Sequence, residues 1–156
     1  MLSLAFLVMP FFANAQSWNL GLTVYGEADH GPQAELLIER QFRPFADLGK
    51  WSIAPGVGAR ISQNTGSWIG GGVIAYRTYG EFWRVDAGLM PGYYSDGSEG
   101  KMLGSDLEFR SYLSVGRQVS DSLYIAVGIE HMSNGGIGDY NPGDNRLMVR
   151  LIKLDR

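Results

Sequence analysis

The sequence predicts a single all-β domain, an eight-stranded antiparallel β-barrel of the outer-membrane type. Eight segments alternate between polar and apolar residues, and turn residues separate them. The composition agrees, because 22 glycines and 12% aromatic residues with only 19% charged residues are typical of barrels and sandwiches. Each segment has about ten residues, the length of a tilted strand that crosses a membrane.

The N-terminal segment reads as a secretory signal peptide. Residues 2–12 are almost entirely apolar, and the tripeptide Ala-Asn-Ala at 13–15 matches a signal-peptidase site. The basic residues that usually precede such a segment are missing, since the first Lys or Arg is Arg40. We therefore expect residues 1–15 to be a signal peptide and residues 16–156 to form one barrel domain.

The alternating segments follow one another along the rest of the chain. They cover residues 18–26, 33–42, 51–61, 67–77, 81–90, 106–117, 122–133 and 144–154. The glycine-rich segment 67–77 is the one whose two faces the sequence does not distinguish. With no cysteine, the chain has no disulfide or zinc–thiolate site, and a net charge of −3 gives no reason to expect nucleic-acid binding.

The polar faces carry the charges that decide how the barrel is turned. These residues are Glu27, Glu35, Glu39, Arg60, Arg84, Asp86, Asp106, Glu108, Arg110, Glu130, Arg146 and Arg150. A soluble, lipocalin-like barrel would show them to water and bury the apolar faces, but eight strands enclose too little room for all those large side chains. An outer-membrane barrel instead pairs the charges inside and turns its apolar faces to lipid.

Aromatic residues near the predicted strand ends support the same orientation. Trp18, Trp51, Trp83, Tyr93 and Tyr94 lie where an outer-membrane barrel has its aromatic girdles. We expect these side chains to face outward.

The seventh segment carries the candidate chemistry. His131 and Ser133 are two residues apart on a strand, so both side chains lie on one face, and they continue an apolar stripe over residues 123–129. A histidine base and a serine nucleophile make a hydrolytic pair. For an isolated H-x-S motif the common explanation is two polar residues where a strand leaves the membrane, so the motif alone is a weak signal.

A third group must orient the imidazole ring of such a pair. The eighth segment returns antiparallel to the seventh, which brings Asn145 onto the same outward face as His131. Asp144 has the opposite parity and points inward to Arg146 and Arg150. Asn145 is therefore the expected orienter.

Oxyanion donors are expected just beyond the serine. The Asn134 amide and the backbone amides of Gly135 and Gly136 are the candidates.

Other polar loop residues are expected to be solvated. His30 lies in a turn, and the loop acids Asp96, Glu99, Asp139 and Asp144 are more simply solvated turn residues than ligands of a divalent ion. We expect no cofactor and no metal.

The motif H-x-S-N-G-G at 131–136, followed by N-P-G-x-N at 141–145, resembles the PagL family of lipid A 3-O-deacylases, acyloxyacyl hydrolase-like outer-membrane barrels. The similarity is sharpest over residues 104–154, where G-S-D-L-E-F at 104–109 also resembles the family's sixth-strand region. The resemblance implies that His131 is the base, Ser133 the nucleophile and Asn134 an oxyanion contributor. Asn145 stands where the family has a catalytic glutamate, although the N-P-G-x-N form is shared by many relatives.

The resemblance implies an integral outer-membrane esterase that hydrolyses an ester-linked acyl chain of lipopolysaccharide. Its partners would be lipid A and membrane lipid, and a homodimer remains open. The alternative is a non-catalytic barrel of the same family that binds lipopolysaccharide or is structural, and Asn145 is the feature that favours it.

Overall fold

The computed structural model describes residues 15–27, 31–62, 66–97 and 101–155, with the side chains of 15, 25–27, 31 and 32 left out. The predicted signal peptide therefore lies almost wholly outside the described residues, as do His30 and Glu99. Among the described residues, no helix reaches the length and hydropathy of a membrane-spanning segment.

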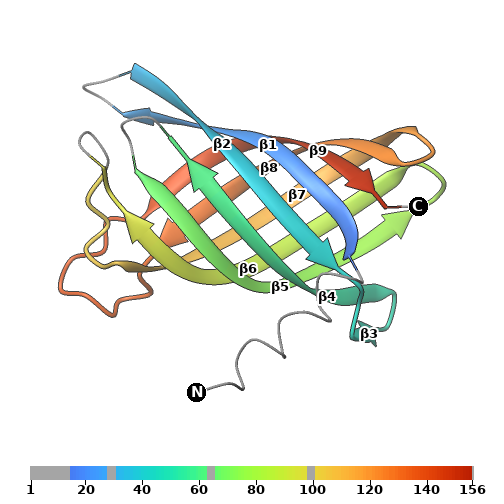
Figure 1. Ribbon diagram of the computed structural model, residues 1–156, viewed down its shortest axis with the longest axis horizontal. Helices are drawn as coiled ribbons and strands as arrows, with labels where there is room; N and C mark the ends of the chain where they lie inside the picture. The colour runs from blue at the N-terminus through green and yellow to red at the C-terminus, as the bar shows by residue number, and fades with distance from the viewer. Residues whose placement is uncertain (1–14, 28–30, 63–65, 98–100, 156) are drawn as a thin grey trace, which may run out of the picture.

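Eight long antiparallel strands and one short strand make up the described fold (Figure 1). The strands are β1 (Ala15–Glu27), β2 (Gly31–Phe42), β3 (Ala46–Leu48), β4 (Trp51–Ile61), β5 (Ser67–Tyr79), β6 (Trp83–Ser95), β7 (Leu107–Ser120), β8 (Leu123–Ser133) and β9 (Asp144–Leu154). The long strands match the eight predicted segments, with several extended by a few residues. The three-residue β3 was not predicted; it forms a hairpin with the start of β4.

The sheet closes on itself. Each long strand pairs with the next long strand along the chain, and β1 also pairs with β9. The strand β2 pairs with the second half of β4, and the short β3 pairs with the start of β4. Closure leaves no unpaired edge in the wall. The predicted eight-stranded antiparallel barrel is confirmed.

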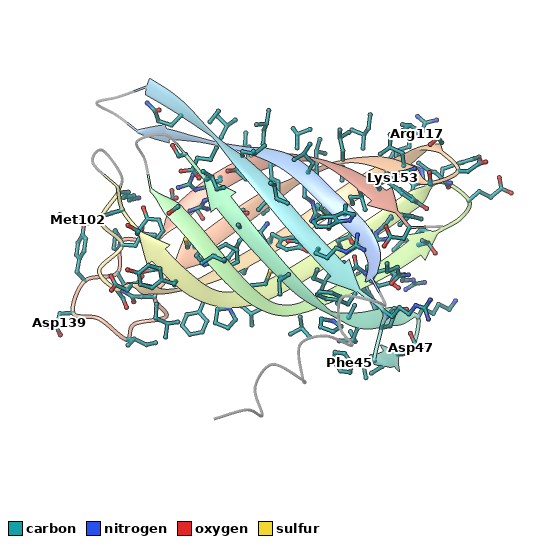
Figure 2. The ribbon with its side chains drawn as sticks, viewed as in Figure 1. Phe45, Asp47, Met102, Arg117, Asp139 and Lys153 are labelled. Carbon is teal, nitrogen blue, oxygen red and sulfur yellow. The ribbon has the colours of Figure 1, made fainter. Side chains whose placement is uncertain are left out.

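The two ends of the barrel differ. The start of β1 and the end of β9 meet at one end, where the Asp155 N–H donates to the Gln16 carbonyl oxygen at 2.9 Å. That end also holds the β3 hairpin, with Phe45 and Asp47, whereas Met102 and Asp139 mark the longer loops at the opposite end (Figure 2). The segments 96–106 and 134–143 connect strands at this loop end.

The outer wall is apolar, as alternation predicts. Exposed side chains include Leu113, Val127, Ile129, Leu147 and Val149, with Val127 and Ile129 each 60% exposed. Arg40 interrupts this face, but its guanidinium lies over the Trp18 ring at 4.4 Å and pairs with Asp155 at 2.7 Å.

Most of the predicted inward charges lie inside the barrel and pair there, while the Glu27 side chain lies outside the described residues. Arg110 bridges Glu39 (Nη1–Oε2, 2.8 Å) and Glu130 (Nε–Oε2, 2.5 Å), and Arg60 reaches the other oxygen of Glu130 at 2.5 Å. Further pairs join Arg60 and Arg146 to Glu35, Arg146 to Asp144, Arg150 to Glu39, and Arg84 to Asp86. A buried charge is tolerated where an opposite charge pairs with it. Glu108 is an exception, because its carboxylate is buried and neither of its oxygens has a hydrogen-bond partner in the described structure.

The interior also holds an apolar cluster that charge alternation did not predict. Its members are Leu37, Trp68, Ile74, Met90, Tyr94, Leu103, Tyr112, Met132 and Met148. A barrel of this size has to be filled by side chains, so bulky apolar residues share the interior with the ion pairs.

Two predicted orientations are wrong. Tyr94 does not join an outer girdle; it is buried inside, because Tyr93 takes the outward position of β6 and the next residue must point inward. Asp106 was expected inside but is exposed, because β7 begins at Leu107 and Asp106 belongs to the loop. Trp18, Trp83 and Tyr93 face outward as predicted.

The Arg110 pairs allow a test of the interior. Arg110→Leu leaves Glu39 and Glu130 facing each other without their shared cation, and is expected to lower the free energy of unfolding by about 3 kcal/mol. Urea unfolding in detergent micelles, followed by tryptophan fluorescence, measures the loss. The exposed turn residue Arg43 supplies the control Arg43→Leu; equal losses in both variants would contradict a structural role for the interior pairs.

Candidate active site

The barrel brings His131 and Asn145 together from neighbouring strands. In the antiparallel register of β8 and β9, His131 is directly opposite Asn145, and on its other side it is opposite Ser111 of β7. All three side chains therefore belong to one row across the outer face, near the loop end of the barrel. The shared outward face predicted for His131 and Asn145 is confirmed, and the register places the two residues directly opposite each other.

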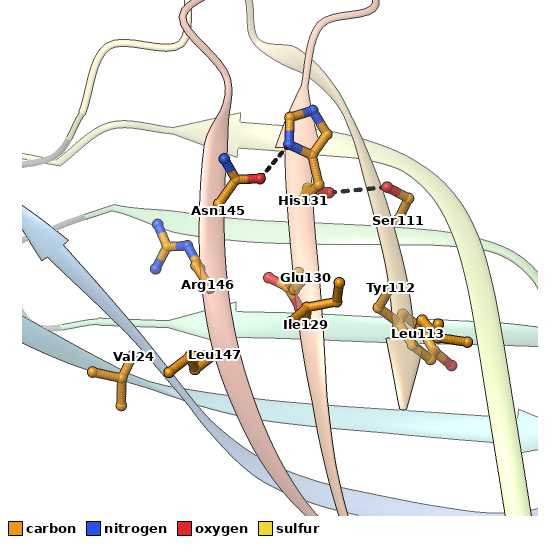
Figure 3. A pocket seen from close by; sticks show the side chains of 10 residues that line it. All are labelled: Val24, Ser111, Tyr112, Leu113, Ile129, Glu130, His131, Asn145, Arg146 and Leu147. Atoms are coloured by element: carbon orange, nitrogen blue, oxygen red, sulfur yellow. Dashed lines mark hydrogen bonds between the residues drawn. The ribbon is translucent and has the colours of Figure 1, made fainter. Parts of the chain in front are cut away.

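A hydrogen bond fixes the imidazole ring. The His131 Nδ1 lies 2.8 Å from the Asn145 Oδ1 (Figure 3). A carbonyl oxygen only accepts hydrogen bonds, so the Nδ1 carries the proton and donates it. In the neutral ring the Nε2 is then the unprotonated nitrogen, which is the atom a general base needs.

Gly143 leaves the space that the ring occupies. A Cβ at this position would lie 3.0 Å from the His131 Cε1 and 3.7 Å from its Nε2. The residue also has φ +61°, a conformation that favours glycine. The backbone just before Asn145 thus packs against one side of the imidazole and limits its rotation.

Ser133 is the last residue of β8, half-buried on the outward parity of His131. Its register partner is Phe109 at the start of β7. Within the described residues no hydrogen bond joins the Ser133 hydroxyl to the His131 ring. In enzymes without substrate, such bonds are often long and tighten only when substrate binds.

Asn134 lies directly beyond Ser133, and its side chain is completely buried. Its Nδ2 donates to the carbonyl oxygens of Leu103 (3.0 Å) and Tyr140 (2.8 Å), and its Oδ1 accepts from the Gly136 N–H (2.9 Å). The Nδ2 donors of Asn134 and the Gly136 N–H are thus engaged by acceptors in the loops at this end of the barrel. Of the three predicted oxyanion donors, the Gly135 N–H is the one to which no described partner is assigned.

An apolar groove runs down the wall from this row. Its volume is about 630 Å³, and Figure 3 shows its lining. The lining residues are Val24, Ser111, Tyr112, Leu113, Ile129, Glu130, His131, Asn145, Arg146 and Leu147. The outward-facing lining residues below His131 are aliphatic. The polar row of Ser111, His131 and Asn145 therefore lies at one end of an apolar groove on the outer face.

Sequence reasoning did not single out Ser111. Its hydroxyl donates to the His131 carbonyl oxygen at 3.4 Å, on the side of the histidine away from Asn145. The signal was present, because Ser111 has outward parity in a predicted strand whose neighbouring outward residues, Phe109 and Leu113, are apolar.

The loop acids form no cation site in the described part of the chain, where no group of three or more His, Asp or Glu residues converges. Asp96 and Asp139 are exposed, while Asp144 is buried and paired with Arg146.

The sequence matches a known protein family. The family model of lipid A 3-O-deacylase (PagL) matches residues 11–152. The chain belongs to the PagL family. No curated protein matches the sequence significantly.

A solved PagL structure shares the fold. The crystal structure described as that of the outer membrane enzyme PagL superposes with a TM-score of 0.63 at 16% sequence identity, covering 89% of this chain and 98% of that one. At this identity the likeness concerns the barrel itself. Lipid A deacylation is the reaction for which the family is named, and the site lies on a barrel of the same fold.

The His131–Asn145 hydrogen bond predicts a defined tautomer. Selective ¹⁵N labelling of histidine should show His131 as the Nδ1–H form in the folded protein. Asn145→Ala removes the acceptor and is expected to shift the ring towards the Nε2–H form. Identical nitrogen chemical shifts in both proteins would mean that Asn145 does not orient the ring.

Proposed function

We propose that the protein is an outer-membrane esterase that removes the 3-O-linked acyl chain of lipid A by a Ser133–His131 mechanism. The observation that supports this most strongly is the His131 Nδ1–Asn145 Oδ1 hydrogen bond of 2.8 Å, located on the outer wall at the head of an apolar groove. A polar row in this position has no evident role in stabilising a lipid-facing surface, but it suits a reaction on a lipid ester.

The proposed reaction begins with a proton transfer. The His131 Nε2 takes the proton of the Ser133 hydroxyl as Oγ attacks the ester carbonyl carbon. The tetrahedral oxyanion receives a hydrogen bond from the Gly135 N–H. Collapse of this intermediate breaks the bond to the sugar oxygen, which leaves with the proton from His131. A water molecule activated by His131 then hydrolyses the acyl-enzyme and releases the fatty acid.

Asn145 takes the orienting part of the acid's role but not its charge. Its Oδ1 holds the Nδ1–H, which keeps Nε2 available as the base. An amide does not stabilise the imidazolium that forms during the reaction as a carboxylate does. A carboxylate in its place should therefore accelerate the reaction.

The apolar groove is the proposed acyl-chain site. Leu113, Ile129, Leu147 and Val24 extend below His131, and Leu147 is 68% exposed. An acyl chain that lies beside the barrel in the membrane enters this groove without leaving the hydrocarbon layer. The outward-facing site is consistent with an integral outer-membrane location.

A non-catalytic lipid A-binding barrel is the second candidate. Two observations favour it: the neutral Asn145 at the acid position and the Ser133 hydroxyl, which in the described structure makes no hydrogen bond to His131. The experiment below separates the two.

Lipid A from cells that express the protein should lose one 3-O-linked acyl chain, as measured by mass spectrometry. Ser133→Ala and His131→Ala are each expected to reduce the rate by at least about 100-fold, since they remove the nucleophile and the base. Identical lipid A spectra for wild type and Ser133→Ala would overturn the enzymatic proposal and leave the binding role.

The same assay tests Asn145. Asn145→Glu is expected to raise the rate and Asn145→Ala to lower it about tenfold or more. Unchanged rates for both variants would remove Asn145 from the mechanism.

Filling the groove should affect long chains selectively. Ile129→Trp is expected to raise KM for long-chain esters several-fold while leaving short-chain esters unaffected, because only a long chain reaches that depth. Val127→Trp is the matched control, since Val127 is equally exposed on the same strand but does not line the groove. Equal effects of the two variants would argue against a chain-binding groove.

A further inference from the structure

The N–H donors of Asn134 are engaged within the loops instead of being available to an oxyanion. Its side chain is 0% exposed, and both N–H groups of its Nδ2 have backbone acceptors, the carbonyl oxygens of Leu103 and Tyr140. Its backbone N–H donates to the Asn141 Oδ1 at 3.2 Å. Each donor of this residue is therefore used before any substrate binds.

The first of these acceptors, the Leu103 carbonyl oxygen, belongs to a loop residue whose side chain lies inside the barrel. Leu103 lies in the loop segment 101–106, yet its side chain is only 1% exposed and packs in the interior cluster with Trp68, Tyr94 and Met132. The Tyr94 hydroxyl, also inside, donates to the Lys101 carbonyl oxygen at 2.9 Å. This loop is thus fixed from within the barrel.

The second acceptor, the Tyr140 carbonyl oxygen, belongs to the loop 134–143 that follows Ser133. This loop and the Leu103 loop touch through their backbones. Gly104 has φ +89°, and a Cβ there would lie 1.8 Å from the Tyr140 carbonyl oxygen. A Cβ at Gly138 would in turn lie 2.6 Å from the Gly104 carbonyl oxygen. Only a residue without a side chain fits at Gly104, so the contact depends on glycine.

We propose that Asn134 is a positioning residue, which clamps the loop 134–143 to the interior-anchored Leu103 and so fixes Ser133 at the end of β8. This inference rests on the proposed function of Ser133. Strand ends open more readily than strand centres, and a nucleophile on the last residue of a strand needs such support. The oxyanion donor is then the Gly135 backbone amide, held in place by the same clamp.

A double-mutant cycle distinguishes a clamp from direct contact with the oxyanion. Asn134→Ala and Gly104→Ala are each expected to lower kcat for lipid A in detergent by about 10- to 100-fold with little change in KM, because Ser133 is misplaced while the groove is intact. Since both variants break one clamp, the double variant should lose no more than the worse single variant. Losses that multiply would show that Asn134 acts on the reaction independently, and would overturn the proposal.

Gly80→Ala controls for backbone strain. Gly80 has φ +58° with nothing within 4 Å of its would-be Cβ, in the turn between β5 and β6 at the opposite end of the barrel. This variant carries the same conformational cost without touching the loops, and its kcat should equal that of the wild type.

Hydrogen exchange tests the clamp without relying on activity. The Gly136 N–H, which donates to the Asn134 Oδ1, should exchange slowly in the wild type and at least tenfold faster in both Asn134→Ala and Leu103→Ala. Leu103→Ala matters most, because it leaves every atom of the loop 134–143 in place. Unchanged exchange in Leu103→Ala would overturn the clamp even if the deacylase proposal holds. Accelerated exchange with no deacylation by the wild type would support the clamp while refuting the proposed function.

Discussion

The buried ion-pair network sets the orientation of the strands that it joins, which are β2, β4, β6, β7, β8 and β9. Arg110 lies between Glu39 and Glu130 and pairs with both inside the barrel. On the apolar outer face these carboxylates would lack this cation, so their side chains stay inside. Glu130 immediately precedes His131, and neighbouring residues of a strand point to opposite sides. By holding Glu130 inside, the network places His131 on the outer wall, where Asn145 arrives from the next strand. The position of the site on the outer wall therefore depends on ion pairs in the barrel interior, although those pairs do not contact the substrate.

Three constraints of different origin converge on the end of β8. The β8–β9 register sets His131 opposite Asn145, the glycine at 143 packs against the imidazole ring, and the buried Asn134 ties the following loop to Leu103. Each constraint acts on the backbone or on a ring rather than on the serine itself. In the proposed mechanism this rigidity compensates in part for an orienting group that carries no charge.

Alternation was sufficient to predict the barrel, the inward ion pairs and the juxtaposition of His131 with Asn145, because each follows from strand parity and antiparallel pairing. It could not predict what lies beyond strand ends. Leu103 enters the barrel from a loop, and the Asn134 amide finds backbone carbonyls that are 31 and 6 residues away in sequence. Tyr94 was placed wrongly for a different reason: the predicted segment ended at residue 90, whereas β6 continues to Ser95 and its alternation turns Tyr94 inward.

The central claim is that Ser133 is a nucleophile activated by His131 on the outer wall. Purified protein in detergent, treated with an alkyl fluorophosphonate and analysed by peptide mass spectrometry, tests this most directly. A single covalent adduct is expected on Ser133, and it should form much more slowly in His131→Ala. Labelling of a different serine, or labelling of Ser133 at the same rate without His131, would contradict it.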